Sequence, residues 1–464
     1  MNNKAIYFFL TIYALLAASI LFSFEGTGDA GDSVHHYLFA KYAPSHPELF
    51  FNHWAKPLYV LLASPFAQFG FIGVKVFNVL VMTATLFYTI RVAQKLKIKN
   101  AIIAALISVA APLTFTLTFS GLTEPLFALF ITIGIHLVLR HKYLSAALVI
   151  SFLPFIRSEG LIILGVFGVY FMVIRHWKIA IALIFGHVVY SITGYFVHHD
   201  ILWVFKKIPY AHLSSVYGEG GLFHYAEQLI YVIGIPIYIL FGIGCIAILW
   251  KTIKRITTTE IQVLIFLCFA AFFIAHTLFW YLGIFNSMGL KRVFVGVMPL
   301  IAIISLMGLN FITEDLFQKN GVAKRIIQSV FIAYIIIFPF TSNPAAIDLK
   351  RDLELTKDQQ IANMISNEVK KEIGIEHRFL YMHPHLSLAL DIDHFDTKRH
   401  MELTEDILSN LMPGDVIIWE NWFCVVERGI TKEMLESNSE LTPITSKIET
   451  DNGRDIEYAV FQYK

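Results

Sequence analysis

The sequence predicts an all-α polytopic membrane protein, with about eleven transmembrane helices and a small C-terminal α/β domain. The first observation is composition: 56% of the 464 residues are hydrophobic and only 15% are charged, whereas soluble domains carry about 25% charged residues. The second is that the apolar residues gather in runs of roughly membrane-spanning length. The formal net charge of +1 gives no reason to expect nucleic acid or an acidic partner.

The predicted spans begin with the apolar run Ala5–Phe24. No small-x-small cleavage site ends this run, so we expect an uncleaved first helix and not a signal peptide. The second run is too long for one crossing, and we expect it to break near Pro65 or Gly70. The expected spans are about 5–23, 58–90, 101–118, 124–139, 143–156, 160–174, 179–197, 226–250, 261–282, 293–310 and 326–341.

Basic residues in the short loops predict the orientation, because cytoplasmic loops are rich in Lys and Arg. They mark alternate loops, at Lys4, 91–99, 140–142, 175–178, 251–255 and 319–325. The rule places the N-terminus in the cytoplasm and the first outer loop, 24–57, on the opposite face. An odd number of spans also puts the end of the chain on the outer face. We therefore expect a transmembrane module over 1–341 and an extracytoplasmic domain over 342–464.

The polar tail has the pattern of a small folded domain. Helical spacing covers 357–373, and the stretches 379–382, 415–420 and 458–463 read as strands. The turn sequence MPGD introduces the second strand. The three cysteines, Cys245, Cys268 and Cys424, form neither a disulfide framework nor a zinc pattern.

Ionisable residues gather in the predicted outer loops, beginning with the stretch GDAGDSVHHY at 28–37. Cations lie there against the positive-inside rule, at or next to helix ends. Ionisable groups at membrane depth are costly and usually mark a site. The candidate site residues of the outer face are the acids Asp29, Asp32, Glu124 and Glu159, and the cations Lys56, Arg157 and Arg292.

A site that holds both carboxylates and cations predicts proton abstraction close to an anionic group. A phosphate-bearing lipid would supply the anion, and Lys and Arg would bind the phosphate and stabilise it as it leaves. A carboxylate would take the proton from an attacking hydroxyl. This is the chemistry of moving a sugar from a polyprenyl phosphate to an acceptor.

The motifs that carry this chemistry resemble a known family. The first outer loop, with Asp32, Tyr37 and the element Lys56–Pro57–Leu58–Tyr59, resembles that of the polyprenyl-phosphate-dependent glycosyltransferases of the C superfamily (GT-C fold). Protein O-mannosyltransferases and lipid A aminoarabinose transferases belong there. The stretches GLTEPLFALF, PFIRSEGLIIL and LKRVFVGVMPL look like later motifs of bacterial members. Ser33 stands where the family has a second acid, and Asp29 is the candidate substitute.

The resemblance implies an integral membrane glycosyltransferase that works by inversion, without a covalent intermediate. Asp32, or alternatively Asp29, would be the base. Lys56 would bind the donor phosphate, with Arg157 and Arg292 as helpers. Tyr37, Glu124 and Glu159 would orient substrate.

The implied partners are a hexosyl or mannosyl donor linked to polyprenyl phosphate, an acceptor that is lipid, glycan or protein, and membrane lipid. The implied location is the bacterial inner membrane. No cofactor is required by this scheme. A divalent metal is the less favoured alternative, because His35, His36, His46 and His53 lack the spacing of helical zinc ligands.

Structural interpretations stand beside these roles. Asp29 and Asp32 have the residue type of helix N-caps. Lys56 fits an interfacial lysine that precedes a helix-starting proline. Arg157 and Glu159 fit a local ion pair between two short helices. None of these contradicts a role in a site.

Other functions remain as alternatives. A transporter or lipid flippase usually places charges near the membrane midplane and carries repeated halves, whereas here the charges gather at one face. A polysaccharide ligase would share a lipid-linked donor but use a diphosphate carrier. A non-catalytic assembly protein would leave the outer cations unexplained.

Overall fold

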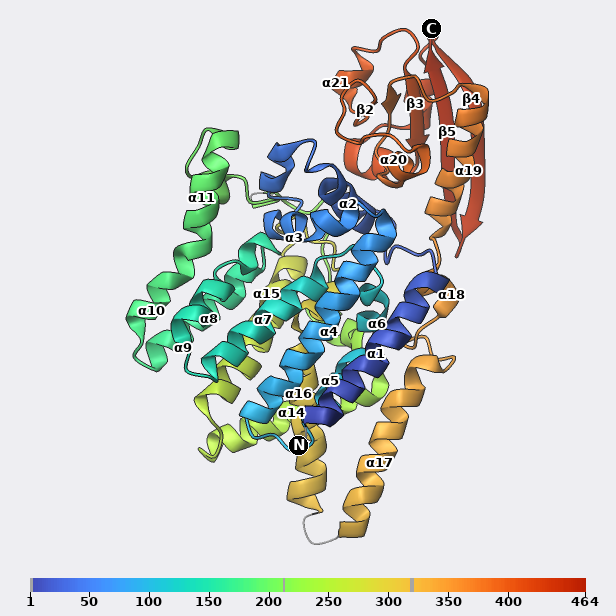
Figure 1. The fold of residues 1–464 in the computed structure, drawn as a ribbon. Helices are drawn as coiled ribbons and strands as arrows, with labels where there is room; N and C mark the ends of the chain where they lie inside the picture. The colour runs from blue at the N-terminus through green and yellow to red at the C-terminus, as the bar shows by residue number, and fades with distance from the viewer. Residues whose placement is uncertain (1–2, 212, 318–320) are drawn as a thin grey trace.

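The computed structural model describes residues 3–211, 213–317 and 321–464. The chain forms a layered body of helices, with the N-terminus at one end and a small α/β unit at the other (Figure 1). Within these residues, seven helices are long and apolar enough to cross a membrane, and four shorter apolar helices accompany them, Pro57–Ala67, Glu124–Val138, Tyr143–Phe155 and Gly160–Val173. The chain is an integral membrane protein, and the count of about eleven spans stays a prediction.

Several predicted spans consist of two helices. The run at 101–118 divides into α5 (Ile102–Ala110) and α6 (Pro112–Thr118), because Pro112 has no N–H to continue the first helix. The run at 226–250 divides at Gly234, whose φ is 75°, into α13 (His224–Ile233) and α14 (Ile235–Ile253). The expectation of one continuous helix over each of these ranges was therefore wrong.

The long run at 58–90 breaks at Gly70, one of the two expected positions. The helices on either side are α3 (Pro57–Ala67) and α4 (Phe71–Lys95). Gly70 has a φ of 81°, a conformation that favours glycine, whereas Pro65 lies inside α3. The short α3 packs on α2 (Asp32–Tyr42), which belongs to the first outer loop (Figure 1).

The remaining helices complete the body around α4. They are α1 (Asn3–Ser23), α7 (Glu124–Val138), α8 (Tyr143–Ile150), α9 (Gly160–Val173), α10 (Trp177–Ile181), α11 (Phe185–His198), α15 (Cys268–Tyr281), α16 (Met298–Asn310) and α17 (Gly321–Ile337). The central helix α16 is buried along nearly its whole length.

Loops that the basic residues placed on one side do lie together. Lys99 pairs with Glu314 at 2.6 Å, Lys251 pairs with Asp315 at 2.8 Å, and Lys324 also contacts Glu314. Arg91, from the same basic stretch as Lys99, donates to the Asn3 side chain at 3.1 Å, so this group of loops adjoins the N-terminus. The alternation of basic loops in the sequence thus corresponds to two distinct ends of the helical body.

The C-terminal α/β unit contains the helix and strands that the tail pattern predicted. Its sheet has the order β2-β1-β3-β5-β4, in which β1 is parallel to both β2 and β3, and β5 is antiparallel to β3 and β4. The strands are β1 (Phe379–Leu380), β2 (His400–Met401), β3 (Val416–Glu420), β4 (Leu441–Asp451) and β5 (Arg454–Tyr463).

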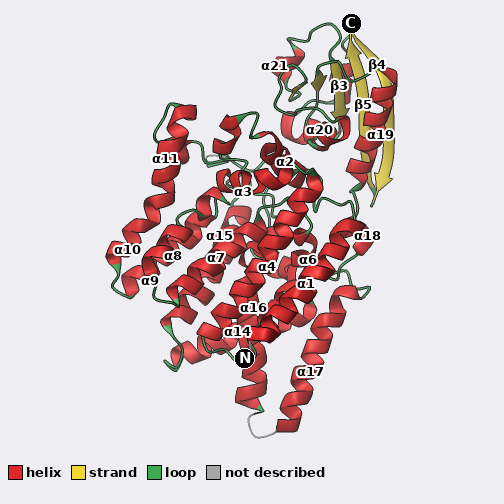
Figure 2. Ribbon diagram, in the orientation of Figure 1, coloured by secondary structure: helices red, strands yellow, loops and turns green. Residues whose placement is uncertain are grey.

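Helix α19 (Lys357–Glu372) covers one face of this sheet (Figure 2). Its residues Ile361, Ile365 and Val369 are fully or almost fully buried and form one core with strand residues. The four-residue spacing between them puts all three on the face of the helix that meets the sheet. The tail pattern did not predict β2 or β4, and the side chains of β4 are mostly exposed and polar at the sheet edge.

Candidate active site

Two aspartates of the first outer loop lie at the start of α2. One carboxylate oxygen of Asp29 accepts a hydrogen bond from the backbone N–H of Ser33 at 2.9 Å, and its other oxygen contacts Arg292. Asp32 is the first residue of α2, and its carboxylate contacts the other terminal nitrogen of Arg292. Neither aspartate is the N-cap that the capping interpretation proposed, because Gly31 holds that position without a side-chain bond and Asp32 lies inside the helix. Asp29 still supports the first turn of α2 through Ser33 and shares one guanidinium with Asp32.

Arg292 comes from the other half of the chain. It belongs to a 3-10 segment, Lys291–Val297, that leads into α16. Its Nε lies 3.6 Å from a carboxylate oxygen of Glu124, the first residue of α7. Glu124 is completely buried, and a carboxylate buried without a cationic neighbour would be destabilising.

Arg157 provides the second cation beside Glu124. Its guanidinium contacts Glu124 at 2.7 Å, Glu159 at 2.8 Å and the Thr123 hydroxyl at 3.2 Å. The expected local pair of Arg157 with Glu159 is therefore present, and Arg157 also joins the larger cluster. Glu124 links the two arginines, so a continuous chain of ion pairs runs from Asp29 to Glu159.

Lys56 differs from the two arginines in its partners. It precedes Pro57, the first residue of α3, and its backbone is left-handed with a φ of 68°. Its ammonium donates to the Ser158 hydroxyl at 3.2 Å, and among residues 3–211, 213–317 and 321–464 it has no carboxylate at ion-pair distance. Burial lowers the pKa of Lys56 to about 8.

The two aspartates differ in exposure and in acidity. The Asp32 side chain is 46% exposed and that of Asp29 only 18%. Burial raises the pKa of Asp29 to about 6 despite Arg292. Burial also acts on Asp32, but the charge and hydrogen bond of Arg292 together with the nearby His36 and His35 outweigh it, and the pKa of Asp32 lies below its ordinary value. Asp32 is thus the ionised and more accessible carboxylate of the pair.

Ser33, which stands in place of the expected second acid, has a structural role. Its side chain is completely buried. Its hydroxyl donates to the Thr27 carbonyl and accepts from the Gly121 N–H at 2.6 Å. Ser33 therefore holds the loop that leads to Glu124 against α2. In space, Asp29 supplies the second carboxylate beside Asp32.

Tyr37 lies in the hydrophobic core. Its ring is 5.4 Å from that of Phe71, and the Lys41 ammonium lies 5.9 Å from its centre. The side chain is 1% exposed. These contacts explain why an aromatic residue occupies the position, and a role of Tyr37 in orienting substrate stays a prediction.

The histidines of the first outer loop are packed with aromatic residues. His36 stacks on Trp54 at 5.1 Å, and His35 lies 5.1 Å from His394 of the C-terminal unit. Across the described part of the chain, no three or more His, Cys, Asp and Glu side chains are arranged to hold a metal ion.

Comparison with known proteins identifies the fold. No known family model and no curated protein matches this sequence. The crystal structure of ArnT from Cupriavidus metallidurans bound to undecaprenyl phosphate matches with a TM-score of 0.60 at 11% identity, over 97% of this chain and 98% of that chain. Its apo form matches with a TM-score of 0.62 at 11% identity, over 98% of each chain. This chain has the ArnT fold.

The ArnT fold spans the whole chain, including the C-terminal α/β unit. The GT-C architecture that the first-loop motifs predicted is therefore confirmed. An identity of 11% makes the likeness one of fold, so the chemistry of this chain has to be argued from its own residues.

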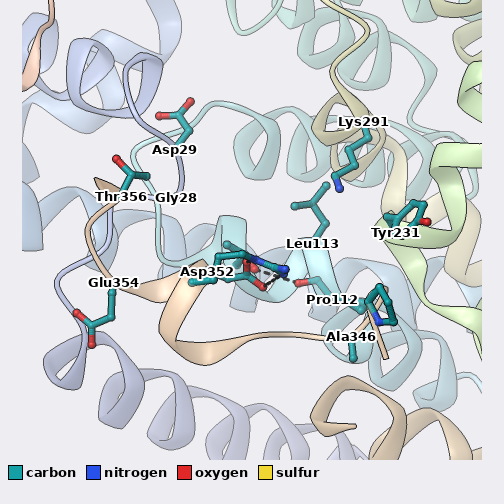
Figure 3. Close-up of a pocket in the computed structure, with 13 residues that line it drawn as sticks. Gly28, Asp29, Pro112, Leu113, Tyr231, Lys291, Ala346, Asp352, Glu354 and Thr356 are labelled. Carbon is teal, nitrogen blue, oxygen red and sulfur yellow. Dashed lines mark hydrogen bonds and ion pairs between the residues drawn. The ribbon is translucent and has the colours of Figure 1, made fainter. Parts of the chain in front are cut away.

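A cavity of about 360 Å³ adjoins the ion-pair cluster in this ArnT-like fold. Apolar residues of α6 and α13, such as Leu113 and Tyr231, line one part of it, and residues 344–356 line another. Asp29 and Lys291 lie on either side of it (Figure 3). Asp29 lines the cavity and also contacts Arg292 of the ion-pair cluster, so it borders both.

Several residues of the site carried no signal in the sequence. Ser158 contacts Lys56, Thr123 contacts Arg157, and His276 of α15 lies 3.9 Å from Glu159. A serine, a threonine and a single histidine in apolar surroundings are common residues of a helical core, so nothing in their spacing marks them. The one available hint was position in the chain: Thr123 precedes Glu124, and Ser158 lies between Arg157 and Glu159.

Proposed function

We propose that this protein is an integral membrane glycosyltransferase that moves a sugar from a polyprenyl-phosphate donor to an acceptor, with inversion at the anomeric carbon. The observation that carries the proposal is the convergence of Asp32, Arg292, Glu124 and Arg157, from four separate segments, beside a lysine without a carboxylate partner among the described residues. A fold shared with an ArnT that was crystallised with undecaprenyl phosphate supports it.

In the proposed reaction, Asp32 takes the proton of an acceptor hydroxyl. The acceptor oxygen attacks the anomeric carbon of the sugar as the bond from that carbon to the phosphate oxygen breaks. The electron pair of this bond leaves with the phosphate, and the products are the glycosylated acceptor and polyprenyl phosphate. A base beside a preformed cationic site is what such a transition state requires.

Lys56 is the cation best suited to bind the donor phosphate. Arg292 already contacts two aspartates and Arg157 two glutamates, whereas the described partner of Lys56 is the neutral Ser158 hydroxyl. A phosphate would offset the desolvation of the buried ammonium. Arg157 and Arg292 would then add positive charge near the leaving phosphate while their ion pairs hold the carboxylates in place.

One observation favours Asp29 as a second candidate base. Asp29 lines the cavity beside the cluster, so an acceptor seated there would meet Asp29 first. Its raised pKa is that of a base which is partly protonated near neutral pH. Asp32 remains the better candidate because it is ionised and more exposed. The pH dependence in the Discussion separates the two.

We place the site at the outer face of a bacterial inner membrane. The support is the positive-inside rule applied to two ends that the structure keeps apart, a basic end near the N-terminus and the acid-rich end at the site. The N-terminus would be cytoplasmic, and the C-terminal α/β unit and the acceptor would lie outside.

The direct test is sugar transfer by purified protein in detergent. Radiolabelled hexose on polyprenyl phosphate is supplied with a membrane extract, and label in the acceptor is followed over time. We expect transfer by wild type and its loss in Asp32→Asn and Lys56→Ala. Asp200→Asn is the matched control, since Asp200 pairs with Lys206 at an exposed outer position.

The outcome also discriminates between the functions. Unchanged transfer in both site variants would refute the site, and transfer only from a diphosphate-linked donor would favour a polysaccharide ligase. Absence of transfer from any donor, together with solute flux in liposomes, would favour a transporter.

A further inference from the structure

The turn that carries Asp29 and leads into Asp32 is held by the C-terminal part of the chain. The Gly26 N–H donates to the Leu353 carbonyl at 2.6 Å. A Cβ at Gly26 would lie 2.2 Å from that carbonyl oxygen, and a Cβ at Gly31 would lie 2.9 Å from the Phe423 ring. Both ends of the turn 26–31 therefore touch residues that follow it by more than 300 positions.

Gln359 holds the middle of this turn. Its side-chain amide donates to the Thr27 hydroxyl at 2.8 Å and to the carbonyls of Asp29 and Ala30, each at 3.2 Å. Gln359 is completely buried. Two of these acceptors are the backbone carbonyls of Asp29 and Ala30, at the start of the segment 29–32 that carries both candidate acids. The position of Gln359 therefore fixes the path of the chain between Asp29 and Asp32.

The orientation of the Gln359 amide is determined by its own helix. Gln359 lies in the first turn of α19. The oxygen of its side-chain amide accepts a hydrogen bond from the Thr356 N–H at 3.1 Å, and its backbone N–H donates to the Thr356 hydroxyl. This capping box occupies the oxygen, which leaves the NH₂ group to face the turn. Carbonyl oxygens can only accept, so no flipped amide would satisfy both sides.

The clamp also adjoins the cavity beside the cluster. Thr356 and Asp29 both line that cavity and lie near Gly28 on the same rim (Figure 3). The start of α19 lies beside the end of α1 from which the first outer loop emerges (Figure 1). The contacts of the C-terminal unit with the helical body thus include the segment that carries the two aspartates.

We propose that Gln359 is a positioning residue for the transferase site, and that the C-terminal α/β unit serves catalysis by holding the Asp29–Asp32 segment in register with Arg292. This inference rests on the proposed function. Gln359 itself touches no substrate. Without its donors, the Ala30 carbonyl loses the Gln359 amide and the Asp29 carbonyl keeps only the Thr27 hydroxyl. The two carboxylates are then no longer held at a fixed place relative to Arg292 and Lys56.

The first test compares Gln359→Met with Gln360→Met. Methionine keeps the length of glutamine without its hydrogen bonds. Gln360 is the exposed neighbour on α19, and its amide donates to the Leu355 carbonyl at 2.9 Å. In Gln359→Met we expect kcat to fall about tenfold or more, because small misplacements of catalytic groups have such effects, with KM for the donor changed less than about twofold. Gln360→Met should keep wild-type kcat.

A second variant distinguishes positioning from a general loss of stability. In Gln359→Glu, an ionised carboxylate faces the oxygens of the turn, whereas its protonated form offers one donor. We expect its kcat relative to wild type to be lower at pH 8 than at pH 5.5. A variant that is merely less stable would lose activity without this pH dependence.

Hydrogen exchange tests the clamp without any turnover. In Gln359→Met, backbone amides of 27–33 should exchange faster than in wild type, while those of β3 and β5 should be unchanged. Wild-type kcat in Gln359→Met, or unchanged exchange at 27–33, would overturn the proposal. A wild-type protein that transfers no sugar would instead refute the proposed function, and the exchange result would still decide whether the clamp exists.

Discussion

Arg292 donates to the carboxylate of Asp32 across 260 residues of sequence. The contact joins the first outer loop to the segment that leads into α16, and it is the step that turns two separate motifs into one site. The same guanidinium contacts Asp29, so one cation restrains both candidate bases. Because opposite charges this close favour the ionised carboxylate, the contact also contributes to the lowered pKa of Asp32, together with His36 and His35.

The alkaline side of the pH profile should report Lys56. Its pKa is lowered to about 8 by burial, so the fraction of charged ammonium in the free enzyme falls as the pH rises through 8. We expect kcat/KM for the donor to fall over the same range, because kcat/KM reports groups of the free enzyme.

Lys56→Arg is the matched variant for this limb. A guanidinium stays charged throughout the range, so the alkaline fall near pH 8 should disappear even if the maximal rate is lower. An unchanged alkaline limb in Lys56→Arg would show that another group titrates there. The measurement is initial rate against pH at low donor concentration.

The acid side of the profile should identify the base. A base must be ionised to accept a proton, and the ionised fraction falls as the pH drops through its pKa. If Asp32 is the base, its lowered pKa keeps kcat/KM constant to below pH 6. If Asp29 is the base, kcat/KM falls as the pH drops through about 6. Asp29→Asn should then abolish transfer, whereas with Asp32 as base it should leave measurable transfer.

Restoring the second acid of the family at Ser33 should harm the protein. In Ser33→Asp, a carboxylate could no longer donate to the Thr27 carbonyl and would be buried beside it. Ser33→Ala removes both hydrogen bonds, and we expect it to lower the free energy of unfolding by about 1–3 kcal/mol.

Thermal unfolding in detergent would check both changes at Ser33. We expect Ser33→Asp to lower the unfolding temperature more than Ser33→Ala and to give no gain in transfer rate. Higher activity in Ser33→Asp would mean that the aspartate reaches the acceptor and that Asp29 does not replace the second acid.

Glu124 should matter more for stability than Glu159. Glu124→Gln removes the carboxylate between two buried guanidinium groups. Leaving a buried charge without any partner costs about 3–5 kcal/mol, and we expect a smaller loss here because Arg292 keeps the two aspartates and Arg157 keeps Glu159. Glu159 is 19% exposed and contacts one arginine closely, so water can replace part of its interaction in Glu159→Gln.

The comparison of the two glutamine variants uses the same assay for both. Unfolding temperature and transfer rate are measured for each, and we expect the larger fall in unfolding temperature for Glu124→Gln. Equal effects would indicate that Arg292 and Arg157 do not depend on Glu124 as their common partner.

Local sequence was sufficient for the features that depend on local physics. Apolar runs predict membrane helices because lipid leaves backbone groups no partner outside the helix, and the basic loops separated the two ends of the body. A glycine or proline stands at all three breaks, Gly70, Pro112 and Gly234. Only the break at Gly70 was expected, because only that apolar run was too long for one crossing. The strands predicted at 415–420 and 458–463 were visible through apolar runs and correspond to β3 and the second half of β5, whereas the polar edge strand β4 was not visible.

The sequence by itself determined which residues could form a site: Asp32 and Lys56 stood out as charges where a membrane protein disfavours them. Only the tertiary structure decided which of them meet. Arg292 contacts both aspartates, Ser33 supports a loop, and Gln359 holds the turn through contacts that span hundreds of residues. A buried serine or glutamine has no distinctive pattern in sequence, because its significance comes from the unpaired groups that folding brings to it.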